Sequence, residues 1–196
     1  MMNLFRSAKN RRLARFFNDE RGSVVAEAVI VLPMLLWAYI ALFVYWDAFR
    51  STNTVQKAAY TLSDMISREQ SKVGIQTSYI NGMKQVMNYL IDDDQDPRLR
   101  VSSIYWSPGD NQFEVQWSRS PNNQMTPLTT TSLQHYASAL PVLAPGDTQI
   151  LVETQVDYLP AFNVGMPNQV FRQFIVTRPR FRTCILMDGQ VGCPIS

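Results

Sequence analysis

Nineteen consecutive residues, from Ala28 to Trp46, carry no formal charge, and this run restricts the possible folds of the chain more than any other feature. At about 1.5 Å per residue, a helix of this length nearly spans the roughly 30 Å hydrocarbon core of a bilayer. A secretory signal peptide has a shorter apolar region, of about 7 to 15 residues, and ends in small residues. This run ends instead in Val44-Tyr45-Trp46-Asp47. We therefore expect residues 23–46 to form a transmembrane helix.

The charges beside the run predict its direction in the membrane. Basic residues close to one end of a span stay in the cytoplasm. Residues 1–22 are therefore expected to be a cytoplasmic leader, and residues 47–196 a head on the opposite side. The leader carries six basic residues against Asp19 and Glu20, namely Arg6, Lys9, Arg11, Arg12, Arg15 and Arg21.

The N-terminal end of the run combines a glycine, Gly22, with an acidic residue, Glu27, five positions later. A charge within a membrane helix costs free energy and indicates a functional role. A basic leader, a glycine and an apolar helix with this glutamate spacing resemble a type IV prepilin-type signal. The pattern from Arg21 to Pro33 resembles in particular the TadE-like pseudopilins and minor pilins of tight-adherence (Flp-type IVb) pilus systems. The resemblance covers about residues 20–50, and Ala28 stands where the family usually has an aromatic residue.

This resemblance implies that a prepilin peptidase cuts between Gly22 and Ser23 on the cytoplasmic side. It implies a single-pass protein of the bacterial inner membrane with a pilin-like periplasmic head. The implied partners are the prepilin peptidase, other pilins or pseudopilins, the pilus machinery and inner membrane lipid. It leaves open whether the protein enters the filament or stays at its base.

Elementary chemistry explains the spacing between the glycine and the glutamate. Cleavage would expose an α-amino group on Ser23, with a pKa near 8 in water. The Glu27 carboxylate of a neighbouring subunit can pair with that ammonium, and such a pair sets the register of a helical bundle. The alternative is that Glu27 lies at the headgroup boundary and stays hydrated. Pro33, within the span, predicts either a kink without function or a hinge.

The 150 residues after Trp46 suffice for one domain with its own core, and their patterns predict an α+β fold. Helical spacing continues to about Glu69, with an apolar stripe of Ala48, Thr52, Val55, Ala59, Leu62 and Ile66. A second helix is expected over residues 76–91, with Tyr79, Met83, Val86, Met87 and Leu90 on its apolar face.

The second half of the head is expected to be rich in strands, in a mixed or antiparallel sheet. Alternating patterns predict strands over residues 99–106, 113–119, 150–158 and 170–182, the last ended or moved to an edge by Pro179. The loop 121–127 and a short helix over 130–140 separate the second strand from the third. Phe113, Val115 and Trp117 are expected on one face.

Cys184 and Cys193 lie on either side of Asp188-Gly189, a strong signal for a two-residue hairpin. With these two residues at the turn, the cysteines fall opposite each other at a non-hydrogen-bonded position. We expect a C-terminal hairpin closed by a disulfide, which would stabilise the head by roughly 2.5 to 3 kcal/mol. The alternative is two reduced cysteines.

Other patterns give weaker hypotheses. The four aspartates between 92 and 96 suggest either a solvated turn or irregular calcium coordination, because an EF-hand would need Gly where Pro97 stands. Four arginines share strand parity, which predicts a basic face that is either solvated or contacts a partner. His135 stands alone, without a motif. The four arginines are Arg172, Arg178, Arg180 and Arg182.

These features predict a structural protein rather than an enzyme. Residues 23–196 carry twelve basic and fourteen acidic residues, and this balance argues against general nucleic-acid binding. The sequence contains no catalytic motif that we can identify, and it indicates no cofactor or metal. We expect a non-catalytic pseudopilin or minor pilin. The alternative is a signal-anchored periplasmic binding or sensing protein that keeps its leader, and a membrane-tethered hydrolase is a more distant third.

Overall fold

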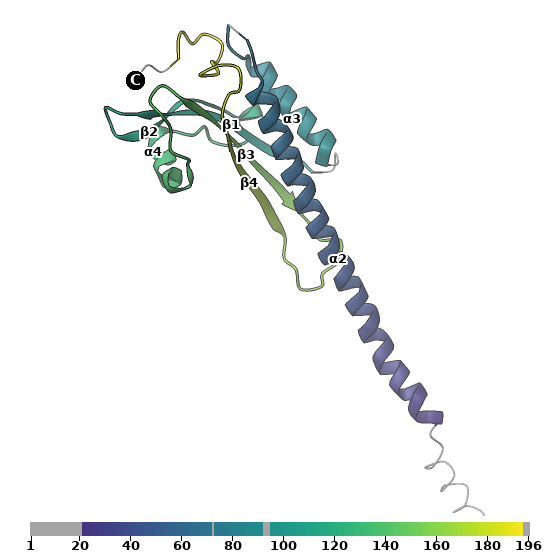
Figure 1. Ribbon diagram of the computed structural model, residues 1–196. Coiled ribbons are helices and arrows are strands. Elements are labelled where there is room, and N and C mark those ends of the chain that lie inside the picture. The colour runs from purple at the N-terminus through teal and green to yellow at the C-terminus, as the bar shows by residue number, and fades with distance from the viewer. Residues whose placement is uncertain (1–20, 72, 92–94, 194–196) are drawn as a thin grey trace, which may run out of the picture. The chain divides into compact units, whose positions relative to one another are not determined.

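The computed structural model describes residues 21–71, 73–91 and 95–193, with side chains from residue 24 onward (Figure 1). Most of the predicted leader and three of the aspartates, Asp92, Asp93 and Asp94, lie outside the described residues. The chain divides into two compact units. The first contains the described part of Met1–Trp46 together with Ala161–Gly165, and the second contains Asp47–Pro160 and the described part of Met166–Ser196.

A single helix, α2 (Arg21–Ser67), forms the N-terminal 47 described residues and confirms the predicted long helix. It continues through Pro33, and no glycine follows Gly22 to weaken it. The helix ends in a tightened turn, in which the amide of Glu69 donates to the carbonyl oxygen of Ile66 at 3.1 Å. Within this helix, the residues up to and including Trp46 belong to the first unit, and those from Asp47 onward belong to the second.

The second unit contains one four-stranded sheet in which every neighbouring pair is antiparallel. This arrangement confirms the α+β class, and the sheet is antiparallel rather than mixed. Strand β4 lies at an edge and ends before Pro179, as predicted. The order is β2-β1-β3-β4, with β1 (Arg98–Ser107), β2 (Gln112–Arg119), β3 (Thr148–Tyr158) and β4 (Gln169–Thr177).

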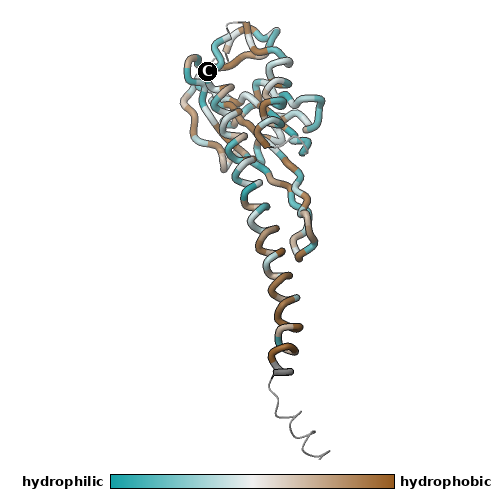
Figure 2. Tube along the Cα trace, turned by 90° about the vertical axis from the view of Figure 1, so that its right-hand side faces the viewer, coloured by the Kyte–Doolittle hydropathy of each residue, from teal (hydrophilic) through white to brown (hydrophobic). Residues whose placement is uncertain are grey.

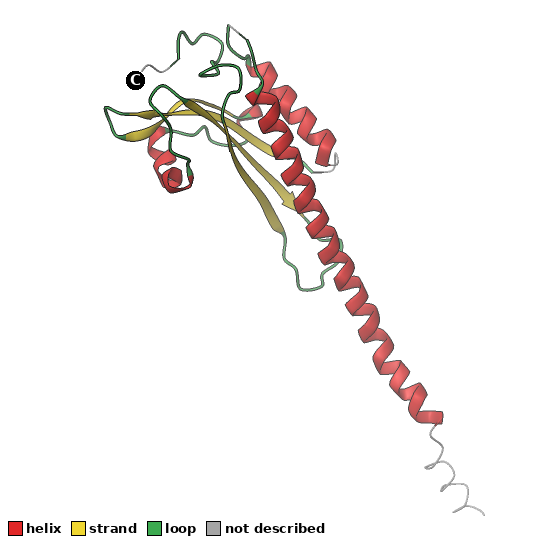
Figure 3. Cartoon of the chain, in the orientation of Figure 1, coloured by secondary structure: helices red, strands yellow, loops and turns green. Residues whose placement is uncertain are grey.

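The sheet has a core on each face because side chains alternate along its strands. Val101 of β1 pairs with Val152 of β3 on one face, and the next residue on β3, Leu151, belongs to the core on the other face. The first core includes Val55 and Leu62 of α2 together with residues of α3 (Thr77–Ile91), so these two helices cover one face (Figure 3). The second core is completed by the short segments α4 (Thr130–Leu133) and η2 (Gln134–Ala139), which follow η1 (Pro121–Asn123).

Two predicted faces are wrong in detail. The pairing of β1 with β2 shifts by one residue at Gln116. Ser103 pairs with Trp117, but the next residue of β1, Ile104, pairs with Val115, so Gln116 is an extra residue on β2. This bulge turns Trp117 to the first core, whereas Phe113 and Val115 belong to the second. On α3 the buried residues are Ile80, Met83, Met87 and Ile91, a stripe rotated from the predicted one.

The C-terminal segment is closed by the expected disulfide between Cys184 and Cys193, whose Cα atoms are 5.7 Å apart. Its arms do not form the predicted hairpin ladder. Gly189 has a positive φ but Asp188 does not, and a type I′ hairpin turn requires both. Leu186 and Asp188 bond instead to the backbone of Ile75, at 2.8 and 2.9 Å.

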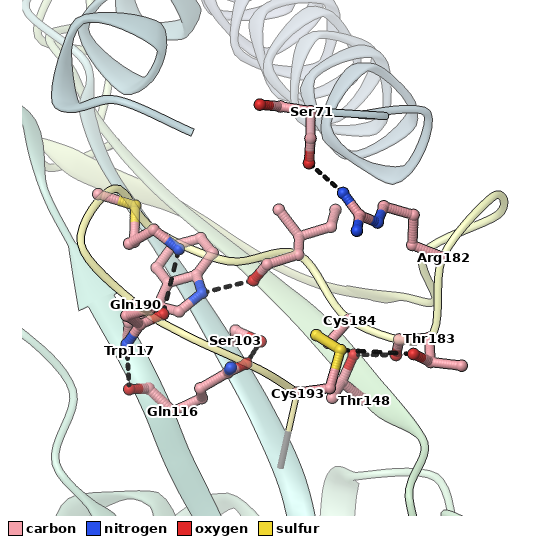
Figure 4. The surroundings of a disulfide bond; sticks show 12 residues. Ser71, Ser103, Gln116, Trp117, Thr148, Arg182, Thr183, Cys184, Gln190 and Cys193 are labelled. Atoms are coloured by element: carbon pink, nitrogen blue, oxygen red, sulfur yellow. Dashed lines mark hydrogen bonds between the residues drawn. A yellow bond between two sulfur atoms is a disulfide. The ribbon is translucent and has the colours of Figure 1, made fainter. Parts of the chain in front are cut away.

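Side-chain contacts hold this C-terminal segment on the sheet (Figure 4). The indole nitrogen of Trp117 donates to the carbonyl oxygen of Ile185 at 2.8 Å, so the side chain that the bulge redirects helps to fix the segment. Gly74 packs closely against the backbone of the same C-terminal segment. A Cβ on Gly74 would lie 2.7 Å from the backbone of Met187, and the φ of +100° also favours glycine there.

Candidate functional site

The first candidate site is the apolar surface of α2 in the first unit. Among the described side chains from Val24 to Trp46, only Val44 is buried and only Ala41 is half-buried. The rest are exposed, and all of them except Glu27 are uncharged, so the trace of this part of the helix is mostly brown in Figure 2. The helix is long and apolar enough to cross a membrane. A core helix of a soluble protein would be buried by its own chain, and this one is not, so its surface suits lipid or other helices.

Glu27 is the only charged side chain in this apolar part of the described helix, and it is exposed. Gly22 and Ser23 lie in the first turn of α2, and the structure describes side chains only from Val24 onward. Glu27 lies four positions after Ser23, which is about one helical turn. The predicted partner of Glu27 is an amine on another subunit. The structure contains a single chain, so the pairing stays a prediction.

The second candidate site is a cavity of about 310 Å³ in the second unit, which the sequence did not predict. Asp47 and Arg50 contribute from α2, Gln95 from the segment before β1, and Tyr158 from the end of β3. The Gln95 side-chain oxygen is buried and has no hydrogen-bond partner within the described residues. The cavity therefore combines both charge signs with an unsatisfied acceptor, as a binding site for a small polar group would.

Tyr158 and Asp47 join the end of the sheet to the helix beside this cavity. The Tyr158 hydroxyl donates to the Asp47 carboxylate at 2.8 Å, and its ring stacks on Phe171 with centroids 5.2 Å apart. Burial, together with the hydrogen bond to Asp47, raises the pKa of Tyr158 to about 12. The contact joins residues 111 positions apart, so no local pattern announces it.

The raised pKa of Tyr158 gives a testable dependence of stability on pH. The unfolded side chain has a pKa near 10, so between pH 10 and 12 the folded state binds more protons than the unfolded state. This contribution to stability is complete below pH 10 and is lost as the pH rises towards 12. In urea unfolding, we expect Tyr158→Phe to make the loss of stability over this range less steep. Tyr89→Phe, at a residue that is 87% exposed, is the control and should leave the slope unchanged.

The structure separates the four arginines that strand parity had grouped, so the predicted basic face is wrong. Strand β4 ends at Thr177, and only Arg172 lies on it. Arg178 pairs with Asp147 at 3.4 Å and Arg180 with Asp64 at 2.6 Å. Arg182 donates to the carbonyl oxygen of Ser71.

The remaining candidates show no assembled chemistry. The Asp96 carboxylate accepts a hydrogen bond from Lys84 at 2.8 Å, which lowers the pKa of Asp96. His135 is exposed on η2. Across residues 21–71, 73–91 and 95–193, no three His, Cys, Asp or Glu side chains gather as a metal site would require.

Comparison of the chain with models of protein families, with curated proteins and with solved structures finds no match.

Proposed function

We propose that this protein is a membrane-anchored pseudopilin or minor pilin of the TadE-like kind, which supports assembly of a tight-adherence pilus and catalyses nothing. One observation carries the proposal: an apolar helical surface, exposed over more than twenty residues, contains a single carboxylate at its N-terminal end. A lipid anchor alone needs no such charge, whereas a helix that packs against copies of itself or related subunits can use it.

Processing and assembly are linked in this proposal. Removal of residues 1–22 creates an ammonium group on Ser23, one turn from Glu27, and leaves the N-terminal end of each apolar helix with one group of each sign. In a bundle of staggered helices, the ammonium of one subunit pairs with the carboxylate of the next. Two opposite charges in apolar surroundings are stabilised only when they are paired, so the pair selects one register.

Cleavage is tested by the N-terminal residue of the protein recovered from membranes of cells that also produce its prepilin peptidase. We expect the wild-type protein to begin at Ser23 and to lack the mass of 22 residues. Gly22→Val should keep the leader, because a β-branched side chain next to the scissile bond obstructs an extended backbone in a protease cleft. Recovery of the full-length wild-type protein, with the peptidase active on another prepilin, would refute the cleavage.

The chain offers a matched control for this substitution. Gly82 lies in α3, and a Cβ there meets no atom within 4 Å. Gly82→Val changes the same residue type in the same way but leaves the N-terminal motif intact, and it should be cut like the wild type. Resistance of both variants would point to a general defect in insertion or folding.

A signal-anchored binding or sensing protein is the second candidate, and the polar cavity beside Asp47 favours it. Such a protein keeps its leader and its full mass, and its activity does not depend on Glu27. The same N-terminal measurement therefore separates the two candidates.

A further inference from the structure

The connection between β3 and β4 is longer than a turn between adjacent antiparallel strands requires, and it contains no charged residue. Two residues suffice for such a turn. Ten residues, 159–168, join these two strands, whereas four residues, 108–111, join β1 to β2. The sequence carries no charge from Tyr158 through Phe171.

The start of this loop is held beside the first charged residue after the apolar run. Tyr158, directly before the loop, donates to Asp47 at 2.8 Å and stacks on Phe171, which is paired with Val156 across the two strands. Asp47 follows Trp46 immediately. The last residue before the loop therefore contacts the first residue after the uncharged part of α2.

The tip of the loop belongs to the same compact unit as the apolar helix. Residues Ala161–Gly165 group with Met1–Trp46 and not with the strands that they connect. Within the described part of this unit, Val164 of the tip and Val44 of the helix are the buried side chains. One apolar side chain on each segment is thus covered.

The tip also exposes an aromatic ring. Phe162 is 52% exposed, and Tyr45 and Trp46 of the same unit are exposed on the last turn of the apolar run. Tyrosine and tryptophan gather at the boundary between membrane and water, and phenylalanine is among the apolar residues with which interfacial segments enter the headgroup region.

We propose that the tip of the β3–β4 loop, with Phe162 at its centre, inserts into the headgroup region of the outer face of the membrane as a second lipid contact beside α2. The occupant of this apolar surface is phospholipid, because the exposed ring belongs to the same compact unit as the exposed apolar side chains of the helix, and no charge within the loop opposes insertion. The inference rests on the proposed membrane anchoring of α2.

Spin labelling of the full chain tests this contact directly. The sequence has two cysteines, and both are in the disulfide, so one introduced cysteine is the only free thiol. Phe162→Cys carries a nitroxide in protein reconstituted into vesicles of phosphatidylethanolamine and phosphatidylglycerol. Val142→Cys is the matched control, because Val142 is also an exposed apolar loop residue, 89% exposed, but lies in the second unit.

Collision rates with oxygen, which concentrates in lipid, and with a water-soluble nickel chelate report the surroundings of each label. We expect the ratio of oxygen to nickel collisions to be several-fold higher for Phe162→Cys than for Val142→Cys. Equal ratios would overturn the inference, because the loop would then be in water. Protection of the Phe162→Cys label from both reagents would also overturn it, because protein rather than lipid would cover the ring.

A third label distinguishes failure of this inference from failure of the anchor. Leu36 lies in the middle of the apolar run and is exposed on α2. Leu36→Cys should show the highest ratio of the three. If the Leu36→Cys label is in lipid and the Phe162→Cys label is in water, only the proposed loop contact is refuted. If the Leu36→Cys label is in water, the membrane span itself is refuted.

Discussion

Replacement of Glu27 by glutamine is expected to abolish pilus assembly while leaving the protein inserted and processed. Glutamine keeps the shape of the side chain and removes only its charge, so in the proposed bundle the Ser23 ammonium of the neighbouring subunit loses its partner. Removing one member of an ion pair in apolar surroundings costs about 3 to 5 kcal/mol. At about 1.4 kcal/mol per tenfold change, each contact between subunits would weaken about a hundredfold or more.

The measurement compares the pili released from cells that produce wild-type protein, Glu27→Gln or Glu27→Asp. Aspartate keeps the charge and is expected to retain partial assembly, since its carboxylate lies one methylene nearer to the helix. All three proteins must be recovered from the membrane with Ser23 as the first residue. Wild-type amounts of pili from Glu27→Gln would show that Glu27 does not register the subunits.

The largest change in stability is expected at an ion pair within the sheet. Arg100 of β1 and Glu153 of β3 face each other across the two strands and form two hydrogen bonds of 2.6 Å, with side chains 11% and 9% exposed. Arg100 also donates to the carbonyl oxygen of Thr126 at 2.6 Å. Glu153→Gln leaves a largely buried guanidinium, 11% exposed, without its counter-charge, and we expect a loss of about 3 to 5 kcal/mol in the free energy of unfolding.

Urea unfolding of the detergent-solubilised protein, followed by tryptophan fluorescence, measures this loss. Asp147→Asn is the control, because it breaks the exposed pair with Arg178 and should change stability by no more than about 1 kcal/mol. The double variant Arg100→Met with Glu153→Leu removes both charges and should recover most of the lost stability. A loss below about 1 kcal/mol for Glu153→Gln would mean that water compensates the arginine.

Local patterns predicted the elements of this fold well. Charge-free length and helical spacing predicted α2, and alternation predicted all four strands, because both signals repeat within a few residues. The turn at Asp188-Gly189 was predicted for the same reason. The candidate residues Gly22 and Glu27 follow from spacing within one segment.

Contacts between distant segments could not be predicted in this way. The pairing of the C-terminal segment with Ile75 and the bond between Tyr158 and Asp47 join residues more than one hundred positions apart. The bulge at Gln116 reverses the face of Trp117 without any glycine or proline to indicate it. The cavity beside Asp47 depends on three elements meeting, so no single pattern contains it.

The position of the C-terminal segment determines at what point during synthesis the first core can close. Ile185 and Met187, close to the end of the chain, are part of the first core and pack with residues of α2 and α3. A polypeptide leaves the ribosome with its N-terminus first, so this core stays open until the last residues have been synthesised. Chains truncated during synthesis would therefore leave the apolar core residues of α2 and α3 exposed, and exposed apolar surface favours aggregation.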